Sequence, residues 1–173
     1  NNPGPFTFKG TNTYLVGTTE LAVIDPGPDS EAHRAAILSA AAGRPVTHIL
    51  VTHAHRDHSD GAAALARATG APVLGFGRSA DAERGGTAHQ PAGKEFVDYD
   101  FSPDVRLANG DIVKGADFEL EALHSPGHAP DHLCFALKHA RIVFSGDHVM
   151  AWNTTVIAPP EGRMSDSIAS LER

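Results

Sequence analysis

Short apolar runs alternate with turns rich in glycine, proline and aspartate along the whole chain, a pattern typical of mixed α/β proteins. Runs of apolar and β-branched residues predict strands at 13–16, 21–24, 45–51, 72–76, 118–123, 133–137 and 142–144. Segments rich in helix formers predict helices at 31–42, 59–68 and 168–173. Residues 77–93 show no periodicity, so we expect a mobile loop there, either a substrate flap or a plain connection.

A dense cluster of histidines follows the predicted strand 45–51. The chain there reads T-H-A-H-R-D-H, which places His53, His55, Asp57 and His58 within six positions. If the strand continues through His53 and His55, both rings leave the same side of the backbone and can meet one ion. Burying so many polar groups together without a cation would leave them unpaired at a large cost. The spacing therefore predicts a metal site.

Two more candidate ligands follow predicted strands further along the chain. His128 lies in S-P-G-H and Asp147 in S-G-D-H, each in a turn. Imidazole and carboxylate ligands together favour zinc over iron or manganese. We expect Asp57 and His58 to lie near the amino terminus of the helix predicted at 59–68, where the helix dipole favours bound anions. The isolated histidines are expected to be ordinary surface or core residues: His33, His48, His89 and His139.

The stretch H-A-H-R-D-H resembles the H-x-H-x-D-H signature of the metallo-β-lactamase superfamily. Asp25 in A-V-I-D-P-G, His128 and Asp147 fall where that family has its other motifs, and the order matches across nearly the whole chain. The resemblance implies an α/β fold of the αββα sandwich type, formed as one domain over residues 1–173. It also implies that metal ions bind at one edge of two facing sheets.

The resemblance further implies a role for each motif residue. The first metal ion would be bound by His53, His55 and His128. The second would be bound by Asp57 and His58, with Asp147 bridging the two ions. Asp25 would orient a ligand histidine, as carboxylates beside metal sites commonly do.

The chain departs from the family pattern after the bridging aspartate. The family's last motif is a further histidine, and no histidine follows His148. Adjacent residues of an extended segment point to opposite sides, so His148 is not expected to replace it beside Asp147. The second site is therefore expected to be one protein ligand short. The chain opens without Met and stops within a predicted helix, so we expect truncation at both ends, with the carboxyl-terminal part of the fold missing.

A zinc-dependent hydrolase is the function that these features favour. Zinc lowers the pKa of a bound water toward 7, so a metal-bound hydroxide can attack a substrate at neutral pH. Asp57 is the candidate catalytic residue, as a ligand that also accepts a proton. Through T-N-T-Y-L-V-G and G-D-H-V-M-A-W the chain looks closest to the lactamase-β-like and hydroxyacylglutathione-hydrolase-like small metallo-hydrolases. The expected substrate is a small ester, thioester, lactone or amide.

Two alternatives to that function remain. Some members of the branch that the chain resembles cleave single-stranded RNA, so a metal-dependent endoribonuclease is one alternative. The formal charge of −7 argues against a nucleic-acid partner without deciding the matter, because two metal ions would add positive charge at the site. The other alternative is a non-hydrolytic member of the fold that binds iron.

Polar residues near the motifs are candidates for substrate contact. His132 either faces the active-site cleft or is hydrogen-bonded to the backbone. Asn153 and Thr154 follow the bridging aspartate in a loop, where they contact substrate or form only a structural turn.

Composition agrees with a single globular domain of 173 residues, 41% hydrophobic and 20% charged. The chain has one cysteine, Cys134, which we expect in the core of a strand, and this suggests a reducing cytoplasm. No apolar stretch is long enough to predict a membrane span. The pattern carries no signal for an oligomeric state.

Overall fold

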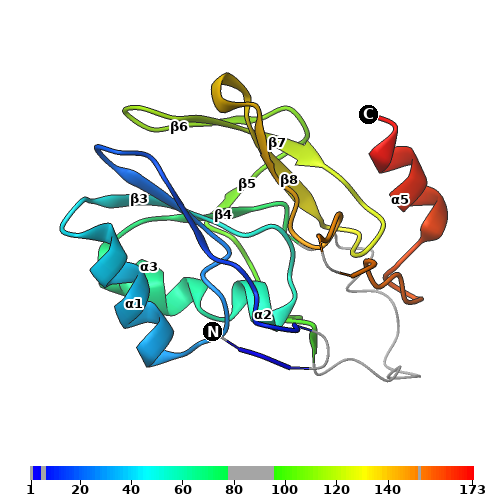
Figure 1. Cartoon of the computed structure of the whole chain (residues 1–173), viewed down its shortest axis with the longest axis horizontal. Coiled ribbons are helices and arrows are strands. Elements are labelled where there is room, and N and C mark those ends of the chain that lie inside the picture. The colour runs from blue at the N-terminus through cyan, green and yellow to red at the C-terminus, as the bar shows by residue number, and fades with distance from the viewer. Residues whose placement is uncertain (1, 5–6, 78–95, 152) are drawn as a thin grey trace.

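The computed structural model describes residues 2–4, 7–77, 96–151 and 153–173. Two sheets face each other, and helices lie outside them (Figure 1). The first sheet has the order β1-β2-β3-β4-β5: Tyr14–Val16, Leu21–Ile24, Val46–Leu50, Val73–Gly75 and Val105–Arg106. The second has the order β6-β7-β8-β9: Ile112–Lys114, Glu119–His124, Leu133–Leu137 and Ile142–Phe144. The loop predicted at 77–93 lies outside the described residues, apart from its first residue.

β2, in the interior of the first sheet, is buried along its whole length, which explains its continuous apolar sequence, whereas β3 has the partly buried Thr47 and His48 between buried residues. In β2 and β3, Ile24 and Leu50 pack between the two sheets together with Phe135. Ile49, on the opposite face of β3, packs against Ile37 of the helix α1, Glu31–Ala41. β1 runs antiparallel to β2. The strands from β2 to β5 run parallel to one another. Parallel strands therefore end at the same edge of the sheet.

Helices lie against the first sheet and beside the end of the second. α1 and α3 (Ala62–Thr69) lie against the first sheet, and α5 (Met164–Leu171) lies away from them, beside β7 and β8 (Figure 1). α5 packs on the turn that follows β7, where the Ser170 hydroxyl donates to the Pro126 carbonyl at 2.8 Å. A Cβ on Gly127, whose φ is +150°, would lie 2.5 Å from Ser167 Cα, so only glycine lets α5 approach this turn. The predicted α/β class with two facing sheets is confirmed.

The longest described helix is α1, with 11 residues. A transmembrane helix needs about 20 apolar residues, and no helix in the described part of the chain is long and apolar enough to cross a membrane.

The helix predicted at 59–68 is wrong in its bounds. The chain instead forms a short helix α2, Arg56–Ser59, and α3 begins only at Ala62. Between them the Gly61 N–H donates to the Gly27 carbonyl at 2.8 Å, and a Cβ on Gly61 would lie 2.9 Å from that oxygen. This contact separates α2 from α3. Asp57 and His58 therefore belong to α2, with Asp57 in its first turn, and do not precede the predicted helix as a loop. The pattern also missed β5 and β6, which have only two and three residues. It predicted only the last part of α5, from residue 168.

Candidate metal centre

Loops from both sheets deliver the predicted ligands to one edge of the sandwich. β3 ends at Leu50, so the strand does not continue through His53 and His55, and the geometry expected for that pair is wrong in this detail. His128 lies in the turn after β7, and Asp147 lies in the turn after β9. The loops are joined where the Leu133 N–H, at the start of β8, donates to the Thr52 carbonyl at 2.7 Å.

Three histidines form the first ligand group, which we define as His53, His55 and His128. His53 Nε2 lies 2.9 Å from His55 Nδ1, and His128 Nε2 lies 3.0 Å from the same atom. Bonds of 2.0–2.1 Å around a tetrahedral zinc ion place its ligand nitrogens about 3.3 Å apart. The spacing therefore fits three ligands of one ion, with only a small outward movement.

The second ligand group lies beside the first and consists of Asp57, His58 and Asp147. His58 Nε2 lies 3.3 Å from Asp57 Oδ2 and 3.4 Å from Asp147 Oδ1. Asp147 Oδ2 lies 3.7 Å from Nε2 of His128, in the first group. The two oxygens of Asp147 therefore face different groups, as a bridging ligand requires. His58 Nε2 is buried between these carboxylate oxygens, which fits a nitrogen that binds a metal.

Hydrogen bonds behind the rings select which nitrogen is free to bind metal. The Thr52 hydroxyl donates to Asp25 Oδ2 at 2.8 Å and accepts from His53 Nδ1 at 3.0 Å, so His53 Nε2 keeps its lone pair. His58 Nδ1 donates to Asp25 Oδ2 at 2.8 Å, which leaves His58 Nε2 free in the same way. The structure thus places Asp25 where it orients a histidine of the second group and, through Thr52, one of the first.

The other two rings are held from the protein side as well. His128 Nδ1 donates to the Val156 carbonyl at 2.5 Å, so its Nε2 faces the first group as an acceptor. His55 Nε2 lies 3.9 Å from Glu161 Oε2, and its Nδ1 faces the group. Each of these two rings therefore presents one nitrogen to the centre of the first group.

The two groups differ in charge. Burial lowers the pKa of His53 well below its ordinary value, and the neighbouring imidazoles lower it further. Burial and His55 lower the pKa of His128 in the same way. In the second group burial also acts to lower the pKa of His58, but the charge of Asp25 and hydrogen bonds to nearby carboxylates outweigh it, and the pKa lies well above its usual range. His53 and His128 are therefore neutral at pH 7, whereas His58 is a cation among carboxylates and gives up its Nε2 proton when a metal ion binds there.

The carboxylates of the second group are held in their charged form. Burial acts to raise the pKa of Asp57, but hydrogen bonds from His58 and Thr11 and the charge of His58 lower it well below its ordinary value. The same balance of burial against His58 lowers the pKa of Asp147. Both side chains are thus anions at neutral pH, which is the form that binds metal ions.

Burial decides between the two alternatives for His132. The ring is fully buried, Nδ1 lies 3.0 Å from the Ser125 hydroxyl, and Nε2 accepts from the Asp147 backbone N–H at 3.2 Å. This favours hydrogen bonding within the protein over substrate contact. A Cβ on Gly146, whose φ is +50°, would lie 2.7 Å from His132 Nε2, so glycine is needed for this approach.

The remaining candidates lie outside both groups. Asn153 and Thr154 are exposed, and the Thr154 N–H donates to Asn153 Oδ1 at 3.0 Å. Their contact with a substrate stays a prediction. His148 is buried, its two ring nitrogens have no hydrogen-bond partner among the described residues, and it belongs to neither group.

Sequence reasoning missed several residues that hold the ligands. Thr52 had a local signal, because it directly precedes the first motif histidine. Asp131 had none: its Oδ2 accepts the Ala54 N–H at 3.0 Å across 77 positions of sequence. Thr11 and Glu161 likewise contact the groups only through folding.

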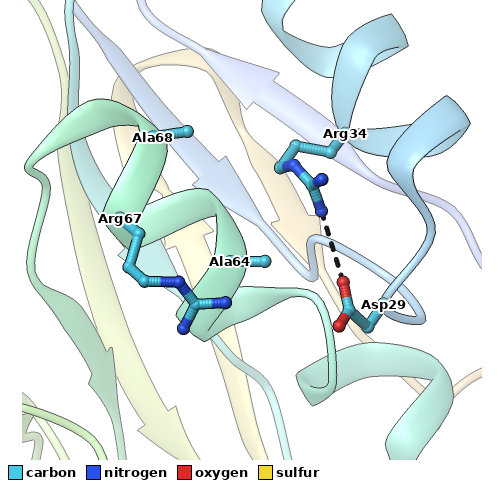
Figure 2. Close-up of a pocket in the computed structure, with 5 residues that line it drawn as sticks. All are labelled: Asp29, Arg34, Ala64, Arg67 and Ala68. Carbon is cyan, nitrogen blue, oxygen red and sulfur yellow. Dashed lines mark hydrogen bonds and ion pairs between the residues drawn. The ribbon is translucent and has the colours of Figure 1, made fainter.

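A separate surface cavity of about 360 Å³ lies between α1 and α3. Figure 2 shows Arg34 directed toward Asp29, at 3.3 Å, with Arg67 on the neighbouring helix. None of the residues that line it belongs to either ligand group.

Two facing sheets with a cluster of histidines and aspartates at one edge define a metal-binding α/β protein. The sequence pattern of the metallo-beta-lactamase superfamily matches residues 6–173, and the chain belongs to that superfamily. Membership and the two ligand groups together indicate divalent metal ions.

Characterised relatives are longer than this chain. A lactamase-like protein of Pestalotiopsis microspora is 35% identical over 90% of the chain and 44% of its own length. An atrochrysone carboxyl ACP thioesterase of Claviceps purpurea is 31% identical over 99% of the chain and 49% of its own length. The chain thus spans about half the length of these relatives.

Solved structures agree with the fold. TTHA1623 in a di-iron-bound form is 30% identical, with a TM-score of 0.74 over 99% of the chain and 82% of that structure. ETHE1 from Myxococcus xanthus is 26% identical, with a TM-score of 0.69 over 95% of the chain and 64% of that structure.

Proposed function

We propose that the protein is a metal-dependent hydrolase that uses two zinc ions to cleave a thioester or a related small ester. The observation that carries this proposal is the pair of adjacent ligand groups that share Asp147. Two metal ions, when bound there, supply a hydroxide near neutral pH and polarise the substrate's carbonyl oxygen. The side chains of the two ligand groups bind the ions and accept the proton.

Asp57 is the proposed proton acceptor of the site. Its side chain is 26% exposed, whereas that of His58 is 3% exposed, so Asp57 is the more open to water and substrate. Hydrogen bonds keep Asp57 as a carboxylate, and its Oδ2 lies toward His58 Nε2 of the same ligand group. Asp147, between the groups, offsets positive charge on both sides. His53 and His128, whose pKa values are lowered by burial, bind an ion without first losing a proton.

The thioester is the favoured substrate because several relatives carry that activity in their names. The Claviceps purpurea protein and the Emericella nidulans protein, which is 32% identical over 90% of the chain, are both named thioesterases. These names support the substrate class and no particular acyl group. Lactones and amides are the other substrates that the same attack on a carbonyl would serve.

A second candidate is an iron-binding member of the fold that is not a hydrolase. The di-iron-bound form of TTHA1623, at 30% identity, favours it. Imidazole and carboxylate ligands accept iron as well as zinc, so the ligand groups suit both metals. Activity after reloading with each metal separates the two candidates.

The test is a substrate panel run on protein stripped with a chelator and reloaded with zinc, iron or manganese. The panel contains an acyl thioester, a lactone, nitrocefin and single-stranded RNA. We expect thioester cleavage in the zinc-loaded protein and none after chelation. His55→Ala should abolish it, and His139→Ala, at an exposed histidine, should not. Thioester cleavage that survives chelation contradicts the proposal, and cleavage of RNA alone supports the endoribonuclease alternative.

A further inference from the structure

The amino-terminal segment contacts the second ligand group directly. The Thr11 hydroxyl donates to Asp57 Oδ2 at 2.5 Å, across 46 positions of sequence. Figure 1 shows this segment running beside α2, the helix that carries Asp57. Neither Thr11 nor Asp57 belongs to the two hydrophobic cores. Loss of the hydrogen bond between them should therefore affect the position of Asp57 more than the packing of the cores.

Asn2 sets the direction of this hydrogen bond. The Thr11 N–H donates to Asn2 Oδ1 at 2.8 Å, so the amide nitrogen of Asn2 is turned toward the Thr11 hydroxyl, 3.3 Å away. An amide nitrogen only donates. The hydroxyl oxygen accepts from it, and the hydroxyl proton points to Asp57.

The Asp57 oxygen that accepts the hydrogen bond from Thr11 is also the oxygen that lies toward the other residues of the second ligand group. Asp57 Oδ2 lies 3.3 Å from His58 Nε2. A carboxylate oxygen has two lone pairs, so one can accept from Thr11 while the other faces a metal ion. The terminal torsion of an aspartate is broad, so without a donor the carboxylate can turn away. Arg56, the arginine of α2, pairs with Asp60 at 3.1 Å and is directed elsewhere.

We propose that Thr11 is a positioning residue that holds Asp57 Oδ2 toward the second metal ion. The inference rests on the proposed function, because it assumes that the second ligand group binds an ion. Thr11 touches no residue of the first ligand group through its hydrogen bonds, which go to Asn2 and Asp57. Its loss should therefore weaken the second ion selectively.

The experiment measures zinc affinity at each site by titrating stripped protein in competition with a chromophoric chelator. Thr11→Val keeps the shape of the side chain and removes the hydroxyl. We expect it to weaken the second dissociation constant about tenfold, within the range found when an outer hydrogen bond to a ligand is lost, and to leave the first unchanged. Thr11→Ser keeps the hydroxyl and should restore the second affinity.

Thr47→Val is the matched control, because Thr47 lies in β3 and its hydroxyl contacts the Leu21 carbonyl and His48 rather than a ligand. It should leave both affinities unchanged. Circular dichroism and thermal melting of the stripped variants show whether each one is folded.

The outcomes separate this inference from the proposed function. If the unaltered protein binds two ions and Thr11→Val binds both as tightly, the positioning role is refuted and the proposed function stands. Equal weakening of both ions by folded Thr11→Val, or no recovery in Thr11→Ser, also refutes it. If the unaltered protein binds no second ion even at millimolar zinc, the two-metal function fails and this inference fails with it.

Discussion

The two ligand groups lie side by side but are held by different forces. In the first group burial and the neighbouring imidazoles lower the pKa values of His53 and His128, so these two rings are neutral and need no countercharge. The second surrounds His58 with the carboxylates of Asp25, Asp57 and Asp147. Buried like charges are costly unless a cation compensates them. The comparison teaches that the first group is preorganised by hydrogen bonds, whereas the second depends on a positive charge at its centre.

The largest effect is expected where the two groups meet. Asp147→Asn keeps the size of the side chain but removes the charge that both ions share, and it should lower kcat/KM for a thioester by about 10²–10³-fold, comparable to the loss of a key electrostatic contact in other enzymes. Steady-state kinetics measure it. Asp131→Asn is the matched control, because an amide oxygen can still accept the Ala54 N–H. Equal losses in the two variants would rule out a special role for Asp147.

The next effect separates metal content from stability. His55→Ala removes the shared partner of the first group and should lower bound metal and melting temperature together. An ion present at 100 times its dissociation constant stabilises the folded state by about 2.7 kcal/mol. Elemental analysis and thermal melting measure the two quantities. Metal content as high as in His139→Ala would show that His55 is not a ligand.

A smaller difference is expected between the two ions in the unaltered protein. The first group offers three histidines, and the second offers one histidine and two carboxylates, one of them shared. We expect the second dissociation constant to exceed the first by about tenfold or more, a range typical of one missing interaction around a metal. Dialysis should then leave close to one equivalent of zinc. Two equivalents retained against a chelator would contradict this ranking.

The smallest effect concerns the backbone of the first group. Asp131 accepts the Ala54 N–H between His53 and His55, so Asp131→Ala should loosen this part of the loop, weaken the first ion several-fold and leave the second unchanged. Zinc titration measures both constants. Asp131→Asn should recover most of the loss. If Asp131→Ala weakened the second ion more than the first, the proposed support of the first group by Asp131 would be contradicted.

Local sequence determined the fold class and the identity of the ligand-type residues. The apolar run at Leu21–Ile24 is continuous because both faces of this strand are buried, and Val46–Leu50 buries Val46, Ile49 and Leu50, so the pattern predicted strands of a central sheet. The histidines of the H-x-H-x-D-H stretch were recognised by residue type and spacing. That identification did not depend on the strand extending through His53, which it does not.

Tertiary structure alone decided how these ligands are arranged and held. Asp147 faces both groups because the turn after β9 meets the loop after β3, and His132 is a buried support because Gly146 packs against it. Thr11 and Asp131 reach the ligand groups across 46 and 77 positions of sequence. Periodicity reports only which face of an element is buried. Which loops meet at the edge, and which nitrogen of each ring stays free, depends on how the two sheets pack against each other.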